Sequence, residues 1–165
     1  MLTFKSICVT GANGFIGKSI CKVLIESNKP VRGIVRNVNL TSNSKHMKYV
    51  PVGDIGYKSN FKNALVDVDC IIHCAGKTHT INEEKADALK IYRSVNVEGT
   101  KQLAEQAAKA GVKRLIFLSS IKVNGEHTNN KCSDESLNSS KKKFMHNDIP
   151  NNKDPYAVSK LEAEK

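Results

Sequence analysis

The sequence predicts an α/β fold, a doubly wound parallel sheet with helices on both faces, and three observations support this. Short apolar runs alternate with segments of helical periodicity, the pattern of a parallel sheet whose connections are helices. Three of these runs, 31–36, 69–74 and 112–119, read as continuously apolar, as strands covered on both faces do. A glycine-rich turn joins the first run to the first helical segment, which is how such sheets commonly begin.

The expected elements follow in a regular order. Strands are expected over 5–10, 31–36, 48–52, 69–74 and 112–119, and helices over 14–28, 59–66, 83–110 and 157–165. Gly111 is the expected C-cap of the long helical stretch. The expected strand order is 3-2-1-4-5, so the order reverses between strands one and four. Ligands of such sheets bind at that point, beside the carboxyl ends of the strands.

The segment 10–17, Thr-Gly-Ala-Asn-Gly-Phe-Ile-Gly, is the strongest functional signal in the chain. It follows a strand and opens a helix, and a helix N-terminus presents unpaired N–H groups and a partial positive charge. Glycines there permit a tight turn, close approach of phosphates, and close packing of helix on strand. The segment therefore predicts a pyrophosphate site, with a turn that binds nothing as the alternative.

Composition limits the class of protein. The chain has 165 residues, of which 39% are hydrophobic and 25% charged, and this suits one globular domain with its own core. No apolar run is long enough to cross a bilayer and the N-terminus lacks a signal-peptide layout, so a cytoplasmic protein with no membrane partner is expected. The cysteines form no CxxC pair and the histidines are not clustered, so no metal site is expected.

The net charge of +10 raises nucleic-acid binding as a possibility. The lysines are dispersed, however, and no RNA-binding aromatic motif is present. A solvated surface that also suits an anionic ligand is favoured, and no nucleic-acid partner is expected.

Tyr156 and Lys160 lie four residues apart in a segment expected to be helical, so their side chains share one face. A tyrosine phenol ordinarily has a pKa of about 10 and is a poor base at neutral pH, but a neighbouring ammonium group favours its ionised form. Such a pair can transfer a proton beside a hydride acceptor. By itself the spacing is common, and a solvated helix face is the alternative.

Several motifs occur in one order along the chain. They are the glycine turn, Asp54 after the third strand, Asn96 in Asn-Val-Glu-Gly-Thr, Ser119-Ser120 after the fifth strand, and the Tyr156/Lys160 pair. In these motifs the chain resembles the extended short-chain dehydrogenase/reductases, in particular the NAD-dependent epimerase/dehydratase family that acts on nucleotide sugars. The resemblance covers essentially the whole chain. It implies a Rossmann-like domain over 1–165 that binds NAD or NADP.

The resemblance also implies roles for individual residues. Ser120 would orient the reacting oxygen, Tyr156 would be the general acid/base, and Lys160 would be its electrostatic partner and anchor the ribose. The cofactor-binding residues would be Gly11, Gly14, Phe15, Ile16, Gly17, Arg36, Asp54, Ile55, Ala75, Gly76, Lys77 and Asn96, with Tyr156 and Lys160. The backbone of Phe15 and Ile16 would face the pyrophosphate, and Asp54 with Ile55 the adenine. For Asn96, bonding to local backbone groups alone is the alternative.

Arg36 departs from the family pattern, in which NAD users often carry an acid at this point for the ribose hydroxyls. An arginine suits a 2′-phosphate or stacks on adenine, so Arg36 favours NADP, with a solvated arginine as the alternative. Asn124 stands in Val-Asn-Gly, where many epimerases have Val-Tyr-Gly. The run around it, 118–126, is similar to UDP-sugar 4-epimerases and 4-keto-sugar reductases of polysaccharide biosynthesis.

Family members continue beyond the point at which this chain ends. The resemblance therefore implies a fold truncated before the C-terminal strands and the substrate domain, with negligible turnover for this chain alone. For the intact enzyme it implies a UDP-sugar substrate and a homodimer. Epimerase, dehydratase and 4-keto-sugar reductase activities all stay open. A non-catalytic dinucleotide-binding sensor or scaffold is the alternative, because the fold by itself permits it.

Overall fold

The structure, a computed structural model, describes residues 4, 6–38, 43–78, 85–126, 143–145 and 147–165. Within them lies a five-stranded sheet in the order β3-β2-β1-β4-β5, and every pairing in it is parallel. The strands are β1 (Ile7–Thr10), β2 (Val31–Val35), β3 (Met47–Pro51), β4 (Cys70–His73) and β5 (Arg114–Phe117). The predicted fold class and strand order are confirmed.

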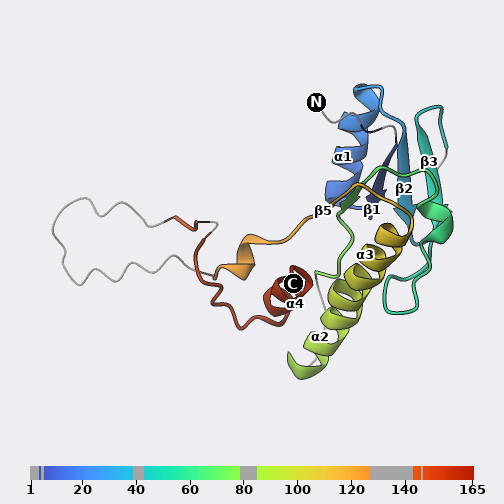
Figure 1. The fold of residues 1–165 in the computed structure, drawn as a ribbon. Coiled ribbons are helices and arrows are strands. Elements are labelled where there is room, and N and C mark those ends of the chain that lie inside the picture. The colour runs from blue at the N-terminus through green and yellow to red at the C-terminus, as the bar shows by residue number, and fades with distance from the viewer. Residues whose placement is uncertain (1–3, 5, 39–42, 79–84, 127–142, 146) are drawn as a thin grey trace, which may run out of the picture.

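Helices cover both faces of the sheet (Figure 1). α1 (Phe15–Glu26) lies on one face and α3 (Gly99–Lys109) on the other. Two separate apolar clusters match this arrangement: Cys21 of α1 shares one with Val9, and Leu103 of α3 shares the other with Cys8. Successive residues of a strand point to opposite faces, which is why Cys8 and Val9 belong to different clusters. The central strands are therefore buried on both sides.

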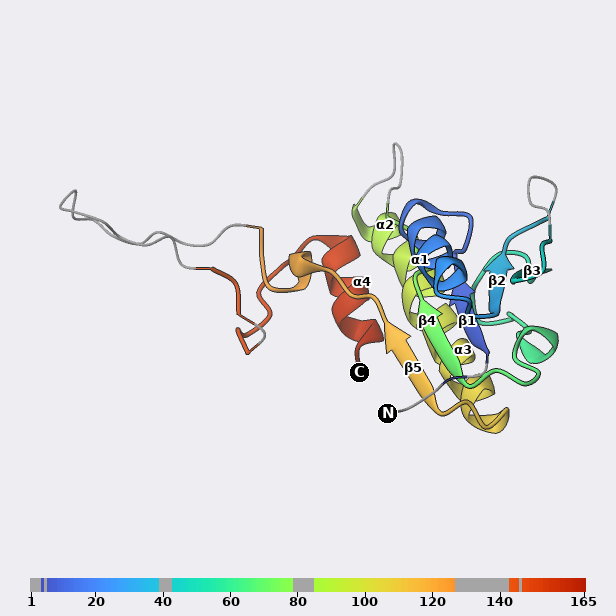
Figure 2. The ribbon, with the colours of Figure 1, turned by 90° about the horizontal axis from the view of Figure 1, so that it is seen from above.

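β5 departs from the prediction of a strand buried on both faces. Its residues alternate between exposed and half-buried, and Ile116 is exposed. In the described part of the chain β5 pairs with β4 alone, and Figure 2 shows it at the margin of the sheet away from β3. The run 112–119 predicted a covered strand because it is largely apolar. Hydrophobicity does not reveal which element, if any, covers each face.

The helical stretch predicted over 83–110 is present as three consecutive pieces within residues 85–109. They are α2 (Lys85–Tyr92), a π-helical segment η2 (Arg93–Glu98), and α3. Gly111 follows with φ = +75°, a left-handed conformation that glycine adopts without a steric penalty. The C-cap itself is Ala110, one residue before the predicted cap, and Gly111 ends the helix from the next position.

The prediction of a helix over 59–66 is wrong. Only a short 3-10 turn, η1 (Lys62–Ala64), forms there. The Asn60 side chain accepts the backbone N–H of Lys62, and Asp67 adopts φ = +56°, so the turn is not extended into a helix. Phe61 and Leu65 are nevertheless fully buried, so the apolar residues that suggested a helix serve the core instead.

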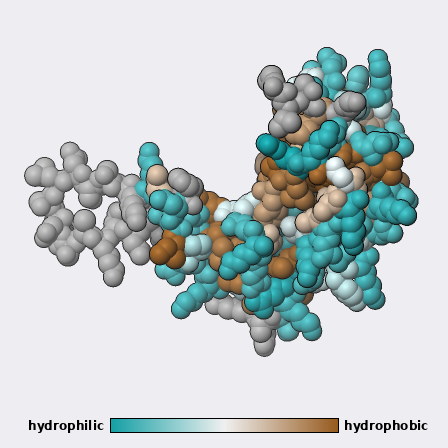
Figure 3. Space-filling model, in the orientation of Figure 1, coloured by the Kyte–Doolittle hydropathy of each residue, from teal (hydrophilic) through white to brown (hydrophobic). Residues whose placement is uncertain are grey.

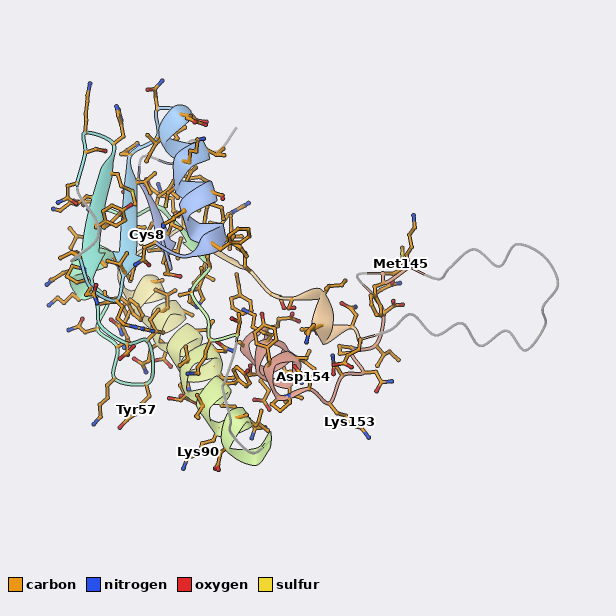
Figure 4. The ribbon with its side chains drawn as sticks, turned by 180° about the vertical axis from the view of Figure 1, so that it is seen from behind. Cys8, Tyr57, Lys90, Met145, Lys153 and Asp154 are labelled. Atoms are coloured by element: carbon orange, nitrogen blue, oxygen red, sulfur yellow. The ribbon has the colours of Figure 1, made fainter. Side chains whose placement is uncertain are left out.

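After β5 the chain forms a 3-10 turn, η3 (Ile121–Val123), and later α4 (Pro155–Ala163). α4 packs against α2, η2 and η3 rather than on the sheet (Figures 1 and 2). It begins at Asp154, whose Oδ1 accepts the Ala157 N–H at 3.0 Å, with Pro155 in the first helical position. Figure 4 labels Asp154 at this end of the helix.

The surface view shows hydrophilic side chains over much of this face and a hollow between the part that carries α1 and the part that carries α4 (Figure 3). None of the described helices is long and apolar enough to cross a bilayer. In the same described residues, no group of three or more His, Cys, Asp or Glu side chains is placed to hold a metal ion. Most of the loop expected over 124–154, including Cys132, lies outside the described residues.

Candidate functional site

The glycine turn brings two stretches of backbone close together after β1. Gly11 has φ = +63°, and the Gly14 N–H donates to its carbonyl at 2.9 Å. A Cβ atom at Gly17 would overlap the same Gly11 carbonyl oxygen. The first turn of α1 therefore packs directly on the strand end, and only glycine fits there.

The N-terminus of α1 is accessible. Gly14 is its N-cap without a side-chain cap, and the first turn carries no acidic side chain. The Phe15 side chain is 94% exposed and Ile16 51%. The first N–H groups of a helix have no acceptor within it, so this end can bind an anion through backbone donors.

The end of β4 closes against the glycine turn. The Ala75 N–H donates to Thr10 Oγ1 at 3.0 Å, and a Cβ at Gly11 would lie 3.1 Å from Ala75 Cα. A Cβ at Gly76 would lie 3.2 Å from Asn96 Oδ1. Two loops far apart in sequence thus form one rim, as the predicted switch point between strands one and four requires.

Asn96, in the π-helical segment, is hydrogen-bonded to this rim through its side chain. Its side chain is 2% exposed. Its Oδ1 accepts the Lys77 N–H at 2.8 Å, and its Nδ2 donates to the Lys77 carbonyl at 3.1 Å and to Ser159 Oγ at 2.9 Å. The Asn96 side chain therefore bonds to the backbone of a distant segment rather than to its own neighbours, and it also joins the rim to α4.

Lys160 extends from α4 toward the same rim. Its Nζ donates to the Leu118 carbonyl at 2.6 Å and lies 3.9 Å from the centre of the Phe117 ring. It is also 4.0 Å from the position a Cβ would take on Gly76. Burial lowers the pKa of Lys160 to about 8, an effect partly opposed by Glu164. The residue is 5% exposed, so the solvated helix face is wrong for it.

Tyr156 lies one turn before Lys160 on α4. It is half-buried, and its ring packs edge-on against Tyr92 of α2, with centroids 5.8 Å apart. Arg93 donates two hydrogen bonds to Glu162, at 2.8 and 2.5 Å, and so ties α4 to the π-helical segment. Both contacts come from the junction of α2 and the π-helical segment, which holds α4 at two points along its length.

Ser120 lies at the N-terminus of η3. Its Oγ accepts the Lys122 N–H at 3.3 Å, and within the described residues it forms no hydrogen bond with Tyr156. α4 packs against η3, so the two belong to neighbouring elements. The adjacent Ser119 donates instead to Glu164 near the end of α4.

Arg36 and Asp54 form a pair of their own at the ends of β2 and β3. Arg36 Nε lies 2.7 Å from Asp54 Oδ1, and both side chains are largely exposed. Ile55 is half-buried and contacts the helix at Gly99, where a Cβ would clash with it. Arg36 therefore forms an ion pair with Asp54 at the surface, where both side chains stay in contact with solvent.

Sequence reasoning missed a set of buried polar side chains beneath the rim. They are Thr10, His73, Thr100 and Ser159, each buried and each hydrogen-bonded. A signal was present, because His73 ends an otherwise apolar strand and Thr100 lies one helical turn after Asn96. A polar residue at such a position requires a partner.

Comparison with known proteins agrees with this geometry. Residues 7–165 match the sequence profile of the NAD dependent epimerase/dehydratase family. The chain is 39% identical over 162 residues to the UDP-glucose 4-epimerase of Vibrio cholerae, over 98% of this chain and 45% of that protein.

Two solved structures are similar as well. MoeE5 in complex with UDP-glucose and NAD is 26% identical with a TM-score of 0.74, over 96% of this chain and 46% of that one. A short-chain dehydrogenase/reductase superfamily protein from Agrobacterium tumefaciens with bound NAD is 25% identical with a TM-score of 0.71, over 96% and 43%. The chain spans about half the length of these relatives. A parallel sheet in the order 3-2-1-4-5, a glycine turn at its switch point and a profile match over nearly all residues show that this chain belongs to the NAD dependent epimerase/dehydratase family.

Proposed function

We propose that residues 1–165 form the cofactor-binding domain of an NAD-dependent enzyme that acts on nucleotide sugars. The observation that carries the proposal is the position of Lys160. Its buried ammonium group lies against Gly76 at the end of β4, on the rim that also contains the glycine turn. A buried cation beside a phosphate-binding turn suits an anionic ligand that spans both.

The residues present fit a dinucleotide. The N–H groups of Phe15, Ile16 and Gly17 at the accessible end of α1 would hold the pyrophosphate. Lys160 would hold the nicotinamide ribose, and the rim 75–77 would line the cofactor. The adenine would lie toward Asp54 and Ile55. The bound nicotinamide would supply the hydride acceptor and donor.

We propose NAD rather than the NADP that Arg36 by itself favours. The Asp54 carboxylate already neutralises the Arg36 guanidinium at 2.7 Å, and it would also repel a 2′-phosphate placed beside that pair. The Agrobacterium tumefaciens protein and MoeE5 are both described with NAD.

Tyr156 would move a proton to or from a sugar hydroxyl or keto oxygen. The Lys160 ammonium, one helical turn away, would stabilise negative charge on the phenol oxygen. Ser120 would donate a hydrogen bond to the reacting oxygen from the end of β5. These three roles come from the family resemblance, and the buried Lys160 supports them.

The substrate class follows from the relatives. The Vibrio cholerae relative is a UDP-glucose 4-epimerase, and MoeE5 is described with UDP-glucose. A UDP-sugar is therefore the proposed substrate, with a homodimer as the active assembly. Because this chain spans about half of these relatives, the 165-residue chain is proposed to bind dinucleotide without turning over UDP-sugars.

Calorimetric titration of the 165-residue chain with NAD and NADP tests the cofactor site. NAD is expected to bind more tightly. Lys160→Met should weaken NAD binding about tenfold or more, the effect of losing one charge-assisted hydrogen bond, whereas Lys160→Arg should retain most of the affinity. Tighter binding of NADP would overturn the cofactor choice, and absence of binding to either dinucleotide would overturn the proposed function.

The catalytic roles require a substrate-binding part. A chimera of residues 1–165 with the remaining part of the Vibrio cholerae relative provides one. In it, Tyr156→Phe is expected to lower turnover at least a hundredfold, as for loss of a general acid/base, and to leave NAD affinity unchanged. Unchanged turnover would remove tyrosine catalysis, and a chimera that binds NAD but never turns over would favour the sensor or scaffold.

A further inference from the structure

His73 is a buried, titratable group that the proposed mechanism does not use. It is the last residue of β4 and 1% exposed. Its Nδ1 lies 2.6 Å from Thr10 Oγ1, and its Nε2 lies 3.0 Å from Thr100 Oγ1. Each ring nitrogen thus meets one hydroxyl, and the two hydroxyls belong to different elements, β1 and α3.

The groups at the two ends of this series of hydrogen bonds, which runs from Asn96 through Thr100, His73 and Thr10 to Ala75, decide the direction of each bond in it. The Thr100 hydroxyl donates to the Asn96 carbonyl at 2.5 Å, so its oxygen must accept from His73 Nε2–H. Nδ1 is then the bare nitrogen of a neutral ring, and it accepts the Thr10 hydroxyl proton. The Thr10 oxygen remains free to accept the Ala75 N–H, as observed at 3.0 Å.

The two ends of this hydrogen-bond series contact different parts of the candidate site. At the Thr10 end, the bond to Ala75 holds the end of β4 against the glycine turn. At the Thr100 end, the bond fixes the backbone of Asn96, whose side chain holds Lys77 and Ser159. Ser159 Oγ in turn donates to the Tyr156 carbonyl at 2.7 Å.

We propose that His73 is a positioning residue that acts in a single tautomer. Its Nδ1 accepts from Thr10 and so holds the glycine turn. Its Nε2–H donates to Thr100 and so holds Asn96, whose side chain supports α4. The importance of these contacts for cofactor binding rests on the proposed function, but the hydrogen bonds of His73 do not depend on that function. A histidine suits the position because a neutral imidazole accepts at one edge and donates at the other.

Two amide variants separate the two edges. The side-chain oxygen of His73→Asn can take the place of Nδ1 and accept from Thr10, but nothing then donates to Thr100. The side-chain nitrogen of His73→Gln can take the place of Nε2–H and donate to Thr100, but nothing then accepts from Thr10. Both variants are uncharged and polar, so each is the control for the other.

Amide hydrogen exchange in the 165-residue chain gives the first readout. In His73→Asn the Ala75 N–H should keep its protection and the Lys77 N–H should lose it, and in His73→Gln the pattern should reverse. NAD affinity should fall in both variants, about tenfold for the loss of one positioned hydrogen bond, because each variant loosens one side of the cofactor site. Equal loss of protection at both amides in both variants would show a merely structural histidine and overturn the proposal.

The imidazole ¹⁵N chemical shifts of the wild-type chain give a second readout that needs no variant. They distinguish a bare from a protonated nitrogen, so a bare Nδ1 supports the proposal and a proton on Nδ1 refutes it, even if a variant does not fold. If the wild-type chain shows the expected tautomer and the two variants show the crossed exchange pattern, but the wild-type chain binds neither dinucleotide, the proposed function is refuted and the positioning geometry stands.

Discussion

Gly11 and Gly111 adopt nearly the same backbone conformation, with φ = +63° and +75°, in very different surroundings. A Cβ atom on Gly11 would lie 3.1 Å from the backbone of Ala75, whereas a Cβ on Gly111 would meet nothing within 4 Å. The glycine pattern of the sequence predicted both positions. The predicted switch point placed Gly11 near the end of β4, but the sequence could not show how closely the two backbones approach, because that contact joins segments more than sixty residues apart.

This pair provides a matched test of the rim. Alanine at either position should cost about 1–2 kcal/mol of stability, because a left-handed conformation is unfavourable for residues with a Cβ. Gly11→Ala should in addition lower NAD affinity about tenfold or more, because the β4 rim must move away, while Gly111→Ala should leave NAD affinity unchanged. Urea unfolding and NAD titration of both variants check this. Equal NAD affinities would show that the close approach is not needed for binding.

α4 is the element on which the proposed catalytic residues depend. The sequence placed Tyr156 and Lys160 on one helical face, which follows from helix periodicity alone. It did not show that Lys160 is buried against Gly76 and Phe117, or that Tyr156 packs on Tyr92. These contacts arise because α4 packs against α2 and the π-helical segment, and no local pattern encodes that docking.

The start of α4 can be weakened without touching Tyr156 or Lys160. Asp154→Ala removes the acceptor of the Ala157 N–H and should cost about 1 kcal/mol, whereas Asp154→Asn keeps a side-chain cap and should cost only a few tenths. Fraying of the first turn should make NAD bind more weakly in Asp154→Ala than in Asp154→Asn. Calorimetric titration beside urea unfolding measures both effects. If the two variants bind NAD equally while differing in stability, the first turn of α4 takes no part in the cofactor site.

At the scale of the whole molecule, the buried polar groups make the fold sensitive to acid. Burial, with a smaller contribution from the Lys160 charge, lowers the pKa of His73 from 6.5 to about 4. Between these two values the unfolded chain binds a proton that the folded chain does not. The free energy of unfolding therefore decreases as the pH falls from 6.5 toward 4, and is unaffected by this group above 6.5.

The expected loss from His73 is about 2 kcal/mol between pH 7 and pH 5. Urea unfolding of the wild type at the two pH values measures it, and His73→Asn, which has no titrating ring, provides the control. The remaining histidines are common to both proteins and cancel in the difference. Equal acid sensitivity of the two proteins would show that the pKa of His73 is the same in the folded and the unfolded chain. That result would contradict its depressed pKa.

The sequence by itself determined the α/β class, the strand order, the glycine turn and the helix face that joins Tyr156 to Lys160. All but the strand order depend on local spacing: the period of a strand or a helix, or the conformation that only glycine adopts easily. The strand order is that of the doubly wound class, which the alternation of strands and helices predicted. Only the tertiary structure decided that β5 is exposed, that Arg36 pairs with Asp54, and that His73 bonds to two threonines. Those features depend on which segments meet in space, and parallel pairing brings together residues that lie far apart along the chain.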